Sequence, residues 1–198
     1  ITGAGRTDAG VHALGQVANF ITEKEVNLPK LKKSLNSVLP KDIVIKNIKK
    51  VPLSFSSRHF AKLKTYRYVI LNSKVPDVFN RNYSLFYFKK LNLIAMKKSL
   101  KYLKGTHDFR AFCVQEERSN FKRTIKDIKI KRKGKYIIID FKGRSFLRKM
   151  VRVLVGFLIG IGTGKLKPED VKKAFKGKIN LSSLFVPSYG LYLKEVKY

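Results

Sequence analysis

One short glycine-rich segment gathers residues that could do nucleophilic or acid–base chemistry. Residues 3–17 read GAGRTDAGVHALGQV and hold one carboxylate, Asp8, between Arg6 and His12. The glycines allow backbone conformations and close approaches that a larger side chain would block. The positive charge of Arg6 favours the ionised form of a nearby carboxylate. The segment therefore predicts a site built around one reactive acid, Asp8. The alternative is an ordinary polar turn in which Asp8 accepts backbone N–H groups.

The overall charge narrows the classes of partner. The chain of 198 residues has 44 Lys and Arg against 13 Asp and Glu, a formal net charge of +31. A surplus of this size suits a polyanion whose counterions are released on contact, which allows RNA, DNA or an acidic membrane. The longest apolar run, residues 150–161, is too short to span a bilayer and contains Arg152. We therefore expect no membrane anchoring.

The composition also bears on fold and compartment. With 44% hydrophobic residues, the chain can bury a substantial core. Its single cysteine, Cys113, excludes an internal disulfide and a cysteine-based zinc site, and predicts a small buried residue in a reducing cytoplasm. The three histidines are too scattered to suggest a metal site.

The predicted elements alternate irregularly, which favours an α+β fold. Strands are predicted at 14–21, 43–51 and 64–72, and a hairpin is predicted from 125–132 and 135–142 around a Lys-Gly turn. Helices are predicted from Asn27 to Pro40, from 93 to 104 and from directly after Ser145 to 161, with a last one starting at Pro168.

The Asp8 segment resembles the signature of the TruA-type tRNA pseudouridine synthases. The run GRTDAGVHA at residues 5–13 matches that signature without interruption. Further matching segments follow in the family's order along nearly the whole chain: Phe55 with Arg58, KTYRY at 64–68, GTHDF at 105–109, Arg123-Thr124, FLRKMVR at 146–152 and PSYGLYL at 187–193. Family members carry a further strand, a tyrosine- and tryptophan-containing segment and a helix before the aspartate motif. We therefore interpret the chain, which begins at Ile1, as an N-terminally truncated copy.

The resemblance implies a pseudouridine synthase fold and a homodimer. That fold is α+β, with two related αβ halves around mostly antiparallel sheets and the catalytic cleft between them. Residues 1–60 would be the remainder of the N-terminal half with the aspartate loop, and residues 61–198 the C-terminal half.

The resemblance also implies an activity, the conversion of uridine to pseudouridine in the anticodon stem-loop of tRNA. This isomerisation breaks the bond from ribose C1′ to base N1 and rejoins the base through C5. Because nothing is added or removed, we expect no metal and no small-molecule cofactor. The reaction needs a nucleophile or base, a surface that holds the freed uracil, and a flipped-out nucleotide.

The resemblance assigns roles to three residues. Asp8 is the catalytic residue, Tyr66 belongs to the active site and stacks on the flipped base, and Arg152 faces Asp8 and orients it. Base flipping also calls for a group that fills the gap left in the RNA, and Arg6 suits that task. We expect Arg6 and Arg58 to bind the RNA.

Two of these residues can also be judged from their own surroundings. A strand tyrosine such as Tyr66 more often packs in a core than on a base. Only the resemblance favours the active site for Tyr66, and it leaves Tyr68 as a residue that packs in the sheet. Arg152 is flanked by apolar residues, where a charge is costly unless it is paired. With so few acids in the chain, Asp8 is the partner we predict for it. The alternative places Arg152 on the solvated face of its helix, four residues after Arg148.

Two other classes of function remain open at the level of sequence. One is a basic RNA-binding or ribosome-associated protein without catalysis, which charge alone would favour. The other is a catalytically inactive relic of an enzyme. A non-catalytic RNA-binding protein has no reason to keep a lone acid among glycines in so cationic a chain.

Overall fold

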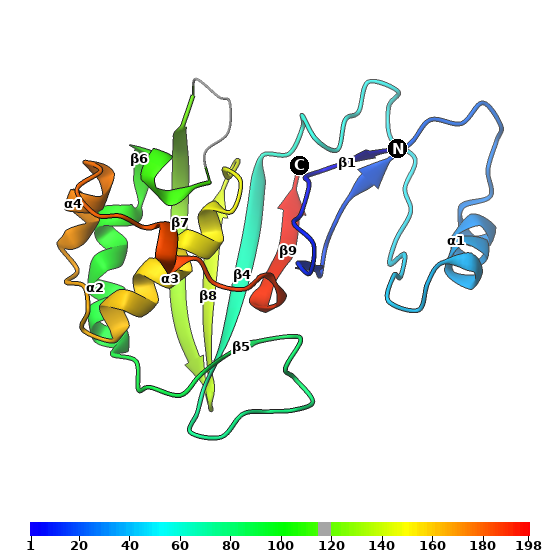
Figure 1. Ribbon diagram of the computed structural model, residues 1–198. Helices are drawn as coiled ribbons and strands as arrows, with labels where there is room; N and C mark the ends of the chain where they lie inside the picture. Colours follow the sequence, from blue (N-terminus) through cyan, green and yellow to red (C-terminus); the bar gives the residue numbers. More distant parts are fainter. Residues whose placement is uncertain (115–119) are drawn as a thin grey trace. The chain divides into compact units, whose positions relative to one another are not determined.

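The chain forms two units, each with its own internal contacts. The structure is a computed structural model that describes residues 1–114 and 120–198 (Figure 1). The first unit comprises Ile1–Ala4 and Val17–Phe60, and the second comprises Gly5–Gln16 and Ala61–Tyr198. The Asp8 segment therefore belongs to the second, larger unit. Among the described residues, no helix is long and apolar enough to cross a membrane.

The first unit is small and open. Strands β1 (Thr2–Gly3) and β3 (Ala18–Asn19) pair antiparallel, and one helix, α1 (Leu28–Val38), follows. The side chain of Asn27 caps α1 by accepting the N–H of Lys30 at 3.0 Å, as the sequence predicts. None of the residues of α1 is fully buried.

Two of the predicted strands are wrong: the one at 14–21 has other bounds, and the one at 43–51 does not form. Instead of one strand at 14–21, the structure has β2 (His12–Ala13) in the second unit and the short β3 in the first. Residues 43–51 form no strand. At Ile45 a side chain takes the hydrogen bonds that a neighbouring strand would supply, because Asn36 donates to the carbonyl of Ile45 at 3.1 Å and accepts its N–H at 2.7 Å.

A seven-stranded sheet forms the centre of the second unit. Its strand order is β2-β9-β4-β8-β7-β6, with β5 also paired to β4. The remaining strands are β4 (Leu63–Asn72), β5 (Leu85–Tyr87), β6 (Gly105–Asp108), β7 (Lys122–Lys133), β8 (Tyr136–Gly143) and β9 (Leu191–Lys197). The pairs β2/β9 and β4/β5 are parallel and the others antiparallel, so the prediction of a mostly antiparallel sheet is confirmed. The predicted strand at 64–72 and the predicted hairpin are present as β4 and as β7 with β8.

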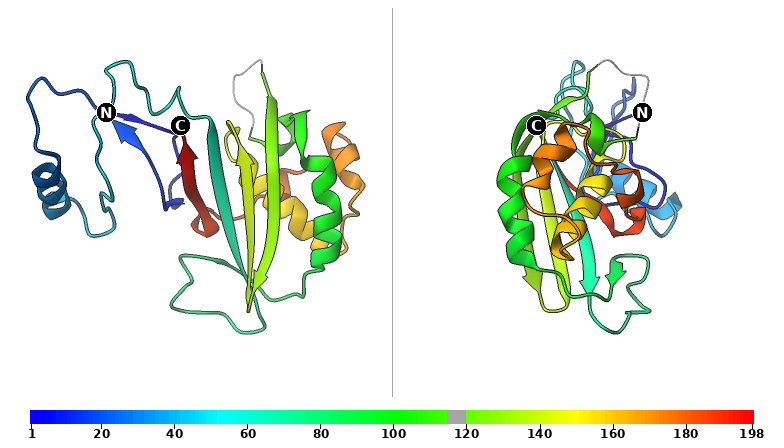
Figure 2. Two further views of the ribbon diagram at one scale, coloured as in Figure 1. Left: turned by 180° about the vertical axis from the view of Figure 1, so that it is seen from behind. Right: turned by 60° about the vertical axis from the view of Figure 1, so that its left-hand side comes forward.

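Helices α2 (Leu93–Leu103), α3 (Met150–Gly162) and α4 (Asp170–Phe175) pack on one face of this sheet (Figure 2). Alternate residues of the central strands, such as Tyr68 and Ile139, are buried there in one hydrophobic cluster with residues of α3. Every residue of α3 is buried. Short 3-10 helices, η1 (Arg110–Phe112), η2 (Ser182–Leu184) and η3 (Ser188–Gly190), complete the unit. The α+β class is therefore confirmed. Cys113, predicted to be buried, is only half-buried because it follows η1 at the edge of the core.

Helix α3 begins four residues later than the sequence predicts, at Met150 rather than directly after Ser145. Lys149 has a φ of 60°, in the left-handed region, so the helix cannot continue backwards through it. The later start puts Arg152 in the first turn of α3, where its N–H is donated to the carbonyl of Lys149 at 3.0 Å.

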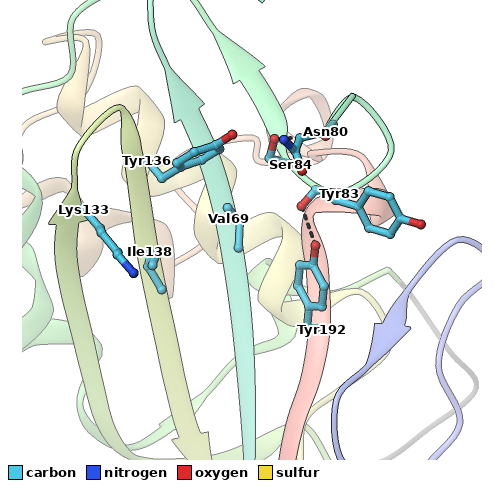
Figure 3. Close-up of a pocket in the computed structure, with 8 residues that line it drawn as sticks. All are labelled: Val69, Asn80, Tyr83, Ser84, Lys133, Tyr136, Ile138 and Tyr192. Atoms are coloured by element: carbon cyan, nitrogen blue, oxygen red, sulfur yellow. Dashed lines mark hydrogen bonds between the residues drawn. The ribbon is translucent and has the colours of Figure 1, made fainter. Parts of the chain in front are cut away.

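The opposite face of the sheet carries a separate feature. Val69 and Ile138, whose strand neighbours face the helices, line a shallow cavity of about 350 Å³ together with Tyr136, Tyr192 and residues of the 80–84 loop (Figure 3). None of the site residues predicted from the sequence lines this cavity.

Candidate active site

The Asp8 segment forms a tight loop that leads into β2. The N–H of Val11 is donated to the carbonyl of Asp8 at 3.1 Å, and Gly10 has a φ of +76°, which favours glycine. At the end of the loop, the His12 ring lies with its centroid 5.0 Å from the ring centroids of both Tyr83 and Tyr192. These contacts and the pairing of β2 with β9 anchor the loop on the second unit.

The structure brings Arg152 and Asp8 together. Nη1 of Arg152 donates to Oδ2 of Asp8 at 3.0 Å, although 144 residues separate them. The Arg152 side chain is 9% exposed and that of Asp8 is 29% exposed. Arg152 therefore lies inside the protein, not on a solvated helix face, and it holds one side of a carboxylate whose other side is accessible.

Arg152 is itself fixed by the segment that follows η2. Its Nε donates to the carbonyl of Val186 at 2.7 Å, and its guanidinium carbon lies 3.7 Å from the ring centroid of Phe185. The next carbonyl, that of Pro187, accepts the hydroxyl of Tyr68 at 2.9 Å. Tyr68 is fully buried, in agreement with its predicted role in sheet packing.

A glycine of α3 allows this segment to approach the helix. A Cβ at Gly156 would overlap the carbonyl of Leu184. Gly156 lies one turn after Arg152, on the same side of the helix. Its lack of a side chain therefore lets the backbone of residues 184–186 lie close enough to cover the guanidinium.

Tyr66 is half-buried beside the same loop. Its hydroxyl is 3.9 Å from the position that a Cβ on Gly5 would take, and its ring meets Phe146 edge-on at 5.2 Å. Burial, and then the negative charge of Asp8, raise the pKa of Tyr66 above its ordinary value of 10.0. The phenol is therefore neutral at physiological pH, and it lies near enough to Asp8 to sense its charge.

The two remaining predicted residues are placed differently. Arg6 is exposed on the second unit, two residues before Asp8, whereas Arg58 is exposed on the first unit. Their roles stay predictions.

The sequence did not single out Phe185 or Gly156. No motif marks a phenylalanine that stacks on an arginine thirty-three positions earlier in the chain, and a helical glycine becomes conspicuous only when a second segment packs on it.

The described part of the chain gathers no group of three or more His, Cys, Asp or Glu side chains that could hold a metal ion. What the site does offer is a carboxylate directed by a guanidinium, open to solvent on one side and close to a neutral tyrosine ring. Such a carboxylate can act as a nucleophile or a base on a ligand placed against the ring.

Fold and site together define a class: an α+β protein with a single loop carboxylate that a buried arginine supports. The family model for tRNA pseudouridine synthase matches residues 1–60 and 100–198. The chain is 39% identical to the tRNA pseudouridine synthase A of Pseudothermotoga lettingae, covering 98% of this chain and 81% of that protein. It is 42% identical to the protein of the same name from Thermoanaerobacter sp. and 40% identical to that of Acetivibrio thermocellus, covering 100% of this chain and 82% of each relative. This chain belongs to the tRNA pseudouridine synthase family.

Proposed function

We propose that this protein converts uridine to pseudouridine in tRNA and that Asp8 is its catalytic residue. Membership of the family and the name that the relatives share support the reaction. The observation that carries the assignment to Asp8 is its hydrogen bond with the buried Arg152 beside the ring of Tyr66. A non-catalytic RNA-binding protein would gain nothing from holding one carboxylate in this way.

In the proposed mechanism, a flipped uridine enters beside the loop and its base lies against Tyr66. Asp8 acts as nucleophile or base while the bond from C1′ to N1 breaks and a bond from C1′ to C5 forms. The hydrogen on C5 is lost and N1 gains one, so the product is an isomer of the substrate. Arg152 keeps the carboxylate pointed at the nucleotide. Because the Tyr66 phenol stays protonated, the base platform adds no negative charge beside Asp8.

We further propose the anticodon arm as the region modified. Arg6 and Arg58 would contact its backbone, and the net charge of +31 would supply much of the affinity through phosphate contacts. A homodimer and a cytoplasmic location, where tRNA is modified, complete this proposal.

The decisive experiment replaces Asp8 and compares it with a matched aspartate. Asp8→Asn should abolish pseudouridine formation while tRNA binding stays within about twofold, because phosphate contacts supply most of the affinity. The control is Asp140→Asn. Asp140 also pairs with a guanidinium, that of Arg67, at 2.8 Å, and its strand position puts it on the face of the sheet away from the helices. That variant should retain activity.

Pseudouridine formed in a tRNA transcript can be quantified by mass spectrometry after chemical labelling, with binding followed by filter retention. Full activity of Asp8→Asn would refute the assignment. A parent protein that binds tRNA tightly but forms no pseudouridine would favour the non-catalytic RNA-binding function.

A further inference from the structure

We infer that Phe185 is a positioning residue of this site, acting through Arg152. Its ring covers the guanidinium and holds it in the plane from which it can reach both Asp8 and the backbone. The inference rests on the proposed function for its kinetic consequence, but its geometric part stands on contacts alone.

The contact is close and well placed. The guanidinium carbon of Arg152 lies 3.7 Å from the centroid of the Phe185 ring, well inside the range of a cation–π interaction. Guanidinium groups stack on aromatic faces because they are planar and weakly hydrated. Arg152 is 7% exposed, so the guanidinium is shielded from water, which strengthens its interaction with the ring.

The stacked arrangement constrains Arg152 in a way that its hydrogen bonds alone would not. Two hydrogen bonds lie in the guanidinium plane: Nε donates to the carbonyl of Val186, and Nη1 donates to Oδ2 of Asp8. Those two bonds leave the plane free to tilt about the line that joins their acceptors. A ring lying on one face of the plane removes that freedom. The direction in which Asp8 is held therefore depends on a residue that does not touch it in any contact described above.

A second cation holds the ring itself. Nζ of Lys149 lies 4.8 Å from the same ring centroid. Lys149 is the N-cap of α3 and has a φ of 60°, in the left-handed region that is unfavourable for a residue other than glycine. Phe185 thus bridges the start of α3 at two points, Lys149 and Arg152, and is only 37% exposed despite lying in a connecting segment.

The geometric part can be tested without any assay of activity. In protein labelled with ¹⁵N-arginine, the Nε–H proton of Arg152 should resonate upfield of the position that it takes when the Phe185 ring is removed, because the guanidinium lies over that ring. Phe185→Leu should abolish that upfield displacement, and Phe185→Tyr should preserve it. The matched control is Phe88→Leu, which removes another partly exposed ring next to a lysine, Lys89 at 5.8 Å, and should leave the resonance unchanged.

The kinetic part follows if pseudouridine formation is established. Phe185→Leu should lower kcat about tenfold with KM for tRNA changed less than twofold, because the loss falls on the orientation of Asp8 and not on RNA binding. Phe185→Tyr, which keeps the aromatic ring, should retain most of the parent's kcat. In an Arg152→Lys background, Phe185→Leu should have almost no further effect, since the planar group that the ring aligns is already gone.

The outcomes test the contact of Phe185 with Arg152 separately from its effect on the rate. An Arg152 resonance that Phe185→Leu leaves in place would overturn the contact. Equal rate losses from Phe185→Leu in the parent and in the Arg152→Lys background would show that Phe185 acts independently of Arg152. A displaced resonance in an inactive parent would refute the proposed function while leaving the contact established.

Discussion

Gly156 offers a sharp test of how the site is assembled. It lies one turn after Arg152, and a Cβ there would overlap the carbonyl of Leu184. To restore an ordinary contact, the backbone at Leu184 would have to move by about 2 Å. Phe185 and Val186 follow directly and would move with it. We therefore expect Gly156→Ala to release Arg152 from its two contacts in that segment.

The expected cost follows from those contacts. Loss of the hydrogen bond from the Arg152 guanidinium to Val186 costs about 1.5–3 kcal/mol, and loss of the stacking on Phe185 costs about 0.5–2 kcal/mol. Alanine regains about 1 kcal/mol of helix propensity over glycine. The free energy of unfolding should thus fall by about 1–4 kcal/mol, and pseudouridine formation should fall at least tenfold because Asp8 loses its fixed partner.

Gly160 in the same helix provides the matched control. A Cβ at Gly160 would lie 2.9 Å from Cδ1 of Leu166, the movable end of a side chain. Gly160→Ala should therefore change the free energy of unfolding by less than about 1 kcal/mol and leave activity near that of the parent. Urea denaturation followed by circular dichroism and the pseudouridine assay measure both quantities. If the two variants behave alike in stability and in rate, the role assigned to Gly156 is wrong.

Three further predictions concern individual side chains. The pKa of Tyr66, measured by spectrophotometric titration as the difference between parent and Tyr66→Phe, should lie above 10.0. In Asp8→Asn this pKa should fall without reaching its ordinary value, because burial is the larger cause of the shift. An unchanged pKa would place Asp8 too far from Tyr66 to act on it. Although burial raises the pKa of Asp140, hydrogen bonds from Arg67 and Lys194 outweigh it and lower that pKa, so the stabilisation is present above the unfolded value of about 3.9 and is lost as the pH falls further. Urea unfolding should therefore depend less on pH below about pH 4 in Asp140→Asn than in the parent, and equal slopes would contradict this. Tyr68→Ala should lower the free energy of unfolding by about 3–5 kcal/mol, since the ring is fully buried. Tyr68→Phe should lower it by only about 1 kcal/mol, because it loses only the hydrogen bond to the carbonyl of Pro187. A small effect of Tyr68→Ala would argue against the packing role.

The sequence alone determined the features that local pattern encodes. The Asp8 loop, the cap of α1 at Asn27, the strand at 64–72 and the hairpin of β7 with β8 all follow from residue types at fixed short spacings. The pairing of Arg152 with Asp8 was also predicted, because a charge among apolar residues needs a partner and the chain offers few acids. A buried charge is one of the few long-range constraints that can be read from sequence, since its cost when unpaired is so large.

Only the tertiary structure decided what surrounds that pair. The predicted strand at 43–51 is absent: a strand needs a neighbour to pair with, and at Ile45 both backbone hydrogen bonds are made with the Asn36 side chain instead. The start of α3 depends on the left-handed backbone of Lys149, which no local preference of lysine predicts. The stacking of Phe185 on Arg152 and the space left by Gly156 arise where two distant segments meet. Such contacts depend on three-dimensional proximity, and sequence spacing carries no record of it.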